Sequence, residues 1–180
     1  MAISNTTPIS IRKATLHDAK ALAELGTHVW TQTFGHTVSP ADLQKYLNAS
    51  YSTSAMEADI TNPLKELIVA TSTTNDIIGF TLMTKGSTEP CLASYSNHVE
   101  LQRIYVHPDY HGTGVGKLLA VELEALARKE GFEHMWLGVW EENARALGLY
   151  GKLGFKEVGK KKFLVGDQVD TDLVMVKAVQ

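Results

Sequence analysis

Cysteine is almost absent from this 180-residue chain, which has only Cys91 and therefore cannot form an internal disulfide. The chain also lacks the paired Cys or Cys/His spacings of zinc sites, so we expect no bound metal. No apolar run approaches the roughly 20 residues that cross a bilayer, and the polar start, Met1–Pro8, has no signal-peptide core. From these absences we expect a cytoplasmic protein without a membrane partner.

An excess of basic residues is absent as well. The chain has 17 Lys and Arg against 20 Asp and Glu, a formal net charge of −3, and its closest basic run is only Lys160–Lys162. Because proteins that bind phosphate backbones usually carry a basic excess, we expect no nucleic-acid partner. No internal repeat, low-complexity tract or linker interrupts the chain, and its length suits one domain, which we place at residues 1–180.

What the chain does have is a mixture of strand and helix patterns along its length. Ser39-Pro40 provides a cap residue and a proline at the first helical position, and Gly131 can terminate another helix. The mixture indicates an α/β or α+β fold with a central mixed sheet. Strands are predicted near residues 9–11, at 67–70, 77–83, 99–106 and 135–139, near Phe163 and at 170–176. Helices are predicted at 15–30, 39–47, 54–60, 115–130 and 143–153, with a break at 31–38 and a polar loop at 85–97.

The most informative segment runs from a strand through a glycine-rich turn into a helix. The strand covers 99–106, the turn contains Gly112 and Gly114, and the helix begins near Val115. Glycine permits positive φ and close approach of the backbone to a ligand, and the first amides of a helix have no partner inside it. Converging amides at the positive end of a helix dipole form a site for a phosphate or a pyrophosphate.

Two common phosphate-binding motifs do not fit this turn. A Walker loop ending at Gly116-Lys117 would need glycine in place of His111 and Ser or Thr in place of Leu118. A dinucleotide fingerprint starting at Gly112 would need glycine in place of Lys117, and the chain has no early βαβ unit. A structural turn that caps the helix is the simplest alternative.

The turn instead resembles the acyl-CoA loop of the GNAT superfamily of N-acetyltransferases, Gln/Arg-x-x-Gly-x-Gly/Ala, with a histidine in the first position. A Leu-x-Arg-Ile-Tyr-Val-x-Pro strand precedes it, and an Asn-x-x-Ala helix with a Tyr-x-x-x-Gly-Phe ending follows later. Within the superfamily the chain resembles bacterial polyamine N-acetyltransferases of the PaiA type. These similarities lie in His111-x-x-Gly114-x-Gly116, Asn143 to Phe155, Thr33-Phe34, Tyr46-Leu47, 137–141 and the tail at 166–173.

The resemblance implies the GNAT fold, a mixed, mostly antiparallel sheet that splays between strands 4 and 5 and is flanked by helices. It also implies an enzyme that transfers the acetyl group of acetyl-CoA directly to a primary amine, with a small polyamine-like acceptor. The pyrophosphate would bind the turn, and the pantetheine arm would lie between the splayed strands. The implied cofactor-binding residues are Ile104, Tyr105, Val106, His111, Gly112, Thr113, Gly114, Val115, Gly116, Lys117, Asn143 and Tyr150.

Tyr150 and Glu100 are the candidate catalytic residues. Asn143 and Tyr150 are seven residues apart and share one helical face, so both could face one cofactor. The resemblance implies that Tyr150 protonates the departing thiolate. The alternative for Asn143 is helix capping, and the alternative for Tyr150 is core packing. The acceptor amine must lose a proton before it attacks. The candidate base is Glu100, with His98 second, and an exposed strand carboxylate is the alternative. Strand alternation places Arg103 opposite Glu100, so we expect it to be a structural or ion-pairing residue rather than the base.

An acceptor amine would enter beside the first two helices. Trp30, Phe34 and Tyr46 are the candidate substrate-binding residues because their rings could wall an aliphatic chain, although each could equally pack in the core. Two other functions stay open: a protein or peptide N-acetyltransferase, and a non-catalytic acyl-CoA sensor. We expect a small-molecule amine as partner and a monomer or homodimer.

Overall fold

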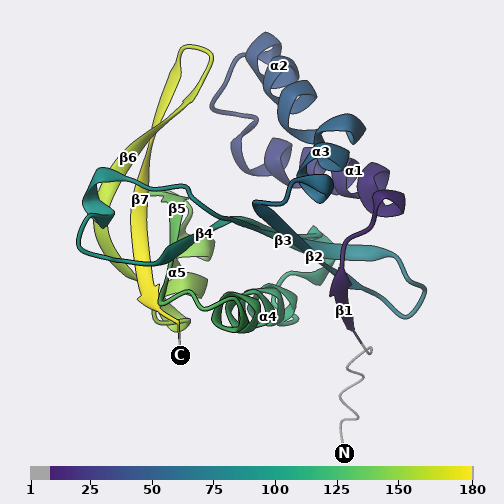
Figure 1. Ribbon diagram of the computed structural model, residues 1–180. Helices are drawn as coiled ribbons and strands as arrows, with labels where there is room; N and C mark the ends of the chain where they lie inside the picture. Colours follow the sequence, from purple (N-terminus) through teal and green to yellow (C-terminus); the bar gives the residue numbers. More distant parts are fainter. Residues whose placement is uncertain (1–8, 180) are drawn as a thin grey trace, which may run out of the picture.

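The computed structural model describes residues 9–179, which form a seven-stranded sheet flanked by helices (Figure 1). The strand order is β1-β2-β3-β4-β5-β7-β6, and all neighbours are antiparallel except β4 and β5. The predicted fold class is therefore confirmed. The strands are β1 Ser10–Lys13, β2 Lys65–Thr71, β3 Ile77–Thr84, β4 His98–Val106, β5 His134–Trp140, β6 Lys156–Val165 and β7 Gln168–Ala178. The helices are α1 Ala19–Phe34, α2 Pro40–Tyr51, α3 Thr53–Thr61, α4 Val115–Lys129 and α5 Ala144–Lys152.

Local capping signals account for most helix ends. The Ser39 side chain accepts a hydrogen bond from the Asp42 amide at the start of α2, and Asn143 accepts one from the Ala146 amide at the start of α5. Gly131 and Gly154 follow α4 and α5 with φ of 86° and 89°, a conformation that glycine adopts without strain. Residue types near these ends therefore predict the starts of α2 and α5 and the ends of α4 and α5.

The predicted break at 31–38 begins too early, because α1 continues to Phe34. Two contacts one helical turn apart extend it: the Thr33 hydroxyl donates to the Val29 carbonyl at 2.9 Å, and the rings of Trp30 and Phe34 pack 5.2 Å apart. The 85–97 segment, predicted as a polar loop, is partly structured and partly buried. It contains a 3₁₀ turn at Pro90–Leu92, and Leu92 is fully buried.

Helices lie on both faces of the sheet (Figure 1), and the two faces carry separate buried clusters. Helices α4 and α5 cover one face, where Leu101, Leu119 and Leu137 belong to one buried cluster. Helices α1 to α3 cover the other face over the first strands, where Leu22, Phe80 and Leu82 belong to a second cluster. No helix within residues 9–179 is long and apolar enough to span a membrane.

The centre of the sheet is split, as the resemblance implies. Strands β4 and β5 pair over only three positions, from His98↔His134 to Glu100↔Trp136, and diverge beyond them. In the diverging part β4 contains a β-bulge against β3, because Met83 pairs with Leu101 whereas Leu82 pairs with Arg103. An extra residue in one strand turns the following side chains to the opposite face.

The bulge overturns the predicted orientation of Arg103. Glu100 pairs with Thr84 and Arg103 pairs with Leu82, two residues apart on β3, so Glu100 and Arg103 share one face of the sheet. Beyond the bulge Arg103 and Tyr105 face α1–α3, whereas Ile104 packs against the α4 core. Strict alternation failed here because the register shift lies between Leu101 and Arg103.

Candidate active site

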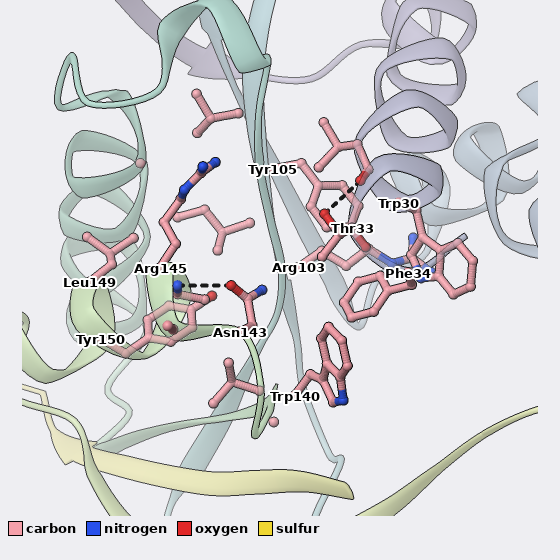
Figure 2. Close-up of a pocket in the computed structure, with 18 of the residues that line it drawn as sticks. Trp30, Thr33, Phe34, Arg103, Tyr105, Trp140, Asn143, Arg145, Leu149 and Tyr150 are labelled. Carbon is pink, nitrogen blue, oxygen red and sulfur yellow. Dashed lines mark hydrogen bonds between the residues drawn. The ribbon is translucent and has the colours of Figure 1, made fainter. Parts of the chain in front are cut away.

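A cavity of about 1210 Å³ lies at the split between β4 and β5 and extends from α4 and α5 to α1 and α2 (Figure 2). It brings most of the predicted site residues together. Thr113 and Val115 are not part of its wall: the Thr113 hydroxyl donates to the Tyr110 carbonyl at 2.6 Å, and the first residue of α4, Val115, is fully buried in the core. The predicted residues in the wall are Trp30, Phe34, Tyr46, Glu100, Ile104, Tyr105, Val106, His111, Gly112, Gly114, Gly116, Lys117, Asn143 and Tyr150.

The glycine turn at the start of α4 presents free backbone to this cavity. Gly112 and Gly114 have φ of 78° and 93°, and a Cβ placed on either would meet no atom within 4 Å. The Leu118 amide donates to the Gly114 carbonyl at 2.9 Å, so the amides from Val115 to Lys117 precede the first helical bond and have no acceptor in the helix. An open cradle of amides at a helix N-terminus fits the pyrophosphate of acetyl-CoA.

His111 is held by both ring nitrogens beside this turn. Its Nε2 lies 2.9 Å from the Val106 carbonyl, and its Nδ1 contacts the Arg145 guanidinium. Because a guanidinium only donates, Nδ1 accepts and the proton of neutral His111 lies on Nε2. Arg145 thereby stands in the cavity wall, as Figure 2 shows. The sequence analysis did not select Arg145. A cation in the first turn of a helix opposes the helix dipole, and this unfavourable position could have indicated a functional role.

Tyr150 combines a buried ring with a free hydroxyl. The ring packs edge-on against Phe155 at 5.8 Å, and within residues 9–179 the hydroxyl has no hydrogen-bond partner. Burial raises the pKa of Tyr150 well above its usual value, so the phenol stays protonated. Asn143 caps α5 through its side-chain oxygen and lines the same part of the cavity (Figure 2). The capping alternative is thus confirmed for Asn143, and its amide group still borders the cavity.

Aromatic rings form the other end of the cavity. Trp30 is only 2% exposed and supports Tyr46 and Phe34, whose ring centroids lie 4.5 Å and 5.2 Å from it. Phe34 and Tyr46 are half-buried and in turn contact Trp140 from β5 and Phe163 from β6, at 5.5 Å and 6.0 Å. The three predicted rings therefore lie together, and Trp140 and Phe163 extend the same wall although sequence reasoning did not select them.

Carboxylates border this aromatic end. Glu100 is 8% exposed, and burial raises its pKa. Asp172 on β7 is 9% exposed, and burial raises its pKa to about 6. Asp170 and Lys161 lie in the same wall. His98, the second candidate base, is outside this wall and points Nδ1 at the Tyr95 carbonyl, 2.7 Å away.

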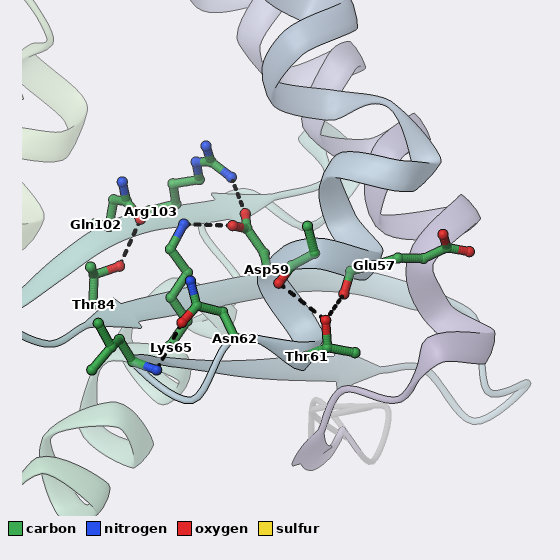
Figure 3. Close-up of polar contacts among 10 residues, drawn as sticks. Glu57, Asp59, Thr61, Asn62, Lys65, Thr84, Gln102 and Arg103 are labelled. Carbon is green, nitrogen blue, oxygen red and sulfur yellow. Dashed lines mark hydrogen bonds and ion pairs between the residues drawn. The ribbon is translucent and has the colours of Figure 1, made fainter.

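A partly buried polar cluster holds α3 against β4 beside the cavity (Figure 3). Asp59 accepts from Arg103 at 2.9 Å and from Lys65 at 2.5 Å, which confirms the ion pair predicted for Arg103. The Arg103 guanidinium also lies over the Tyr51 ring, 4.9 Å from its centroid. The hydroxyls of Tyr51 and Tyr105 are 2.5 Å apart, and burial raises the pKa of Tyr105 to about 12. These contacts hold the side chains of Tyr51, Arg103 and Tyr105 in place in the cavity wall.

Acidic and histidine side chains do not gather into a metal-binding arrangement in the part of the chain that the structure describes: no three or more His, Cys, Asp or Glu residues are grouped to hold an ion.

Comparison with known sequences gives one family and several full-length relatives. The model of the Acetyltransferase (GNAT) family matches residues 29–155. An uncharacterized N-acetyltransferase of Mycobacterium tuberculosis is 29% identical over 160 residues, covering 89% of this chain and 97% of the relative. The spermidine N(1)-acetyltransferase of Thermoplasma acidophilum is 27% identical over 172 residues, covering 94% and 96%.

Solved structures share the fold over nearly the whole chain. The PaiA N-acetyltransferase of Thermoplasma acidophilum in complex with coenzyme A has a TM-score of 0.77 at 24% identity, covering 95% of this chain and 99% of that chain. The ribosomal-protein-S18-alanine N-acetyltransferase of Escherichia coli has a TM-score of 0.70 at 19% identity, covering 96% and 95%. Similar folds with different acceptors mean that the acceptor must be argued from the cavity itself.

Proposed function

The chain belongs to the GNAT family of acetyl-CoA-dependent N-acetyltransferases, and from this premise we propose that its acceptor is a small primary amine of polyamine-like character. The observation that carries this proposal is the pairing of rings and carboxylates at one end of the cavity. Phe34, Tyr46 and Trp140 offer apolar surface to an alkyl chain, and Glu100 and Asp172 offer negative charge to its ammonium groups.

The cofactor end of the cavity supports binding of acetyl-CoA, which supplies the activated thioester. Amides from Val115 to Lys117 hold the pyrophosphate, and the open backbone at Gly112 and Gly114 lets it approach. Ile104 and Val106 border the split in β4, where strand backbone is free to pair with the pantetheine arm. A backbone amide near Ile104 polarises the thioester carbonyl, a contribution of about 3 kcal/mol to the barrier for one such donor.

Two side chains handle protons in this proposal. The candidate base from the sequence, Glu100, lies in the cavity wall at the closed end of the split, and its raised pKa makes it a better proton acceptor than an exposed glutamate. Tyr150 keeps its proton at neutral pH and has no competing partner in the described chain, so its hydroxyl can donate to the departing thiolate. Transfer is direct, without a covalent enzyme intermediate.

The experiment measures CoA release with a thiol reagent across a panel of acceptors at fixed acetyl-CoA. The panel contains spermidine, 1,4-diaminobutane, 1-aminobutane, an aminoglycoside and a peptide with a free N-terminal alanine. We expect turnover with the polyamines, and a higher kcat/KM for 1,4-diaminobutane than for the matched monoamine, because only the diamine keeps an ammonium for the cavity carboxylates. Turnover with the peptide alone would overturn the small-amine proposal, and calorimetric binding of acetyl-CoA without any turnover would indicate a sensor.

A further inference from the structure

Gly138 leaves a gap in β5 beside the split, and two charged side chains fill it. A Cβ placed on Gly138 would lie 2.6 Å from Cε and 3.2 Å from Nζ of Lys161, and 3.3 Å from Oδ2 of Asp172. Lys161 is on β6 and Asp172 on β7, so both side chains lean across β5 toward the space between β5 and β4. A side chain at this position would displace the end of Lys161 and crowd the Asp172 carboxylate.

The register of the sheet places Asp172 beside the open part of the split. Asp172 pairs with Trp140, two residues beyond Gly138, whereas Glu100 belongs to the last pair that closes the split, with Trp136. The thioester must lie where β4 and β5 have separated, because only there is strand backbone free to receive it. Of the two carboxylates, Asp172 is therefore level with the expected position of the reacting atoms.

The Asp172 carboxylate is buried without a partner. Within residues 9–179 it accepts no hydrogen bond and has no cation within 4.0 Å, although it is only 9% exposed and borders the cavity. The nearest cation, Lys161, instead lies 3.6 Å from Glu89 and 5.2 Å from the centre of the Trp136 ring. A buried carboxylate that faces a substrate cavity with its oxygens unoccupied is free to bind an ammonium proton.

We propose that Asp172 is a further catalytic residue, the carboxylate that accepts the proton of the acceptor ammonium. This inference rests on the proposed function and deepens it, because it gives Asp172 the proton-accepting role for which Glu100 is the candidate from the sequence. The ammonium N–H bond breaks and its proton passes to Asp172; the nitrogen lone pair forms the N–C bond, and the C–S bond breaks. Tyr150 donates its proton to the thiolate, and the proton that the new amide nitrogen loses returns to Tyr150. Asp172 releases its proton to water.

The surroundings of Asp172 support this role at neutral pH. Burial raises its pKa to about 6, the charge of Lys161 opposes the rise, and the charge of Asp170 adds to it. The carboxylate is therefore ionised near pH 7 but more basic than an ordinary aspartate. The charged or titratable groups on the elements around it are Lys161 on β6, Asp170 on β7, Glu100 on β4, Glu89 before β4, His36 after α1, and the Lys160–Glu141 ion pair.

The test is the pH profile of kcat/KM for an accepted amine, measured for the wild type, Asp172→Asn and Glu100→Gln. We expect Asp172→Asn to lower kcat at least 100-fold, within the range of general-base contributions, and to remove the fall in rate on the acidic side near pH 6. Binding of acetyl-CoA, measured by calorimetry without acceptor, should stay within twofold. The matched control is Asp167→Asn at the exposed tip of the same hairpin, which should behave as wild type.

Amine basicity provides a readout that a structural role would not move. For amines of similar size but lower pKa, already neutral at the assay pH, the loss in Asp172→Asn should shrink. Asp172→Glu keeps a carboxylate but moves it by one methylene, so kcat should fall while the acidic limb remains. If Asp172→Asn fails to fold, Asp172→Glu decides: a kcat and an acidic limb that both match the wild type overturn the proposal.

Other outcomes separate this inference from the proposed function. If the wild type acetylates no amine, the proposed acceptor class fails first. If the wild type is active and Asp172→Asn keeps its rate and its acidic limb, the role of Asp172 is refuted alone. If only Glu100→Gln flattens the acidic limb, the proton acceptor is Glu100 and the inference is wrong.

Discussion

At the scale of single residues, burial supports the proton-donor role proposed for Tyr150. A phenol removed from water resists ionisation, and a hydroxyl without a partner in the described chain can give its hydrogen bond entirely to an incoming group. The ring is held separately, through its packing on Phe155. Because packing depends on the ring and proton donation on the hydroxyl, the two roles can be separated by removing one atom.

Tyr150→Phe tests that separation. We expect kcat to fall about 100-fold, within the usual range for loss of a general acid, whereas the Kd for acetyl-CoA and the free energy of unfolding change little because the ring remains. Thiol release measures kcat, calorimetry measures the Kd for acetyl-CoA, and urea denaturation measures the free energy of unfolding. A variant with unchanged kcat would show that the thiolate leaves without help from Tyr150.

Arg145 is a second residue whose position suggests a specific effect. It lies beside the glycine turn, where the described chain offers it the His111 ring nitrogen and no carboxylate within 4 Å. We expect Arg145→Gln to raise the Kd for acetyl-CoA about 10-fold, since a charge-assisted hydrogen bond is worth roughly 1.5–3 kcal/mol when buried and less at this exposed site.

The substrate analogue S-acetylpantetheine, which lacks the pyrophosphate, provides the control for Arg145. Its kcat/KM should be the same in wild type and Arg145→Gln if the guanidinium acts on the phosphates. Arg128→Gln, in the last turn of α4 and outside the cavity wall, should leave both thioesters unaffected. Equal losses with both thioesters would instead indicate that Arg145 maintains the shape of the cavity.

Prediction from the sequence placed residues of local motifs in the cavity wall, but it failed where the pairing of strands decides the position of a side chain. The glycine turn, Asn143 and Tyr150 lie in short patterns whose geometry is set within a few residues. Arg103 was assigned to the wrong face because a bulge in β4 depends on pairing with β3, which lies about 20 residues earlier. Asp172 was not selected as a site residue because only the register of β5, β7 and β6 brings it to Gly138, although a charge beside an apolar strand run was visible.

At the scale of elements, caps and apolar spacing predicted the helices and strands well, except that α1 continues past the expected break. The ends of α5 show why caps are informative. Gly154 adopts φ of 89°, and the Phe155 amide donates to the Tyr150 carbonyl, so the helix is closed directly after the catalytic candidate. Strand pairing was only predicted by resemblance, because contacts between distant strands leave no local signal.

Gly151 within α5 and Gly154 just after it should respond to alanine with opposite changes in the free energy of unfolding. Gly151 is exposed within the helix and a Cβ there meets nothing within 4 Å, so Gly151→Ala should raise the free energy of unfolding by about 0.5 kcal/mol. Gly154→Ala should lower it by about 1–2 kcal/mol, because alanine is strained at positive φ. Urea denaturation of both variants measures the difference. Changes of the same sign would show that the closure of α5 does not depend on Gly154.

At the scale of the whole molecule, the sheet consists of two parts joined by a short seam. Strands β1 to β4 and strands β5 to β7 pair with each other only through three residue pairs of β4 and β5. The cavity occupies the split that this short pairing leaves, and its wall contains residues from both parts, including Val106 and Val139. A ligand that fills the split contacts both parts at once, so binding and global stability should be coupled.

Acetyl-CoA should therefore raise the melting temperature, and the glycine turn should control the effect. At a ligand concentration of 100 times Kd the folded state gains about 2.7 kcal/mol, which for a chain of this length corresponds to roughly 5–10 °C. Gly114→Ala should lose most of this shift, because positive φ and an open cradle are both needed there. Gly86→Ala is the matched control, since Gly86 also has positive φ and open space but lies outside the cavity wall. Both variants should melt earlier without ligand, but only Gly114→Ala should fail to respond to it; an equal response in both would place the pyrophosphate elsewhere.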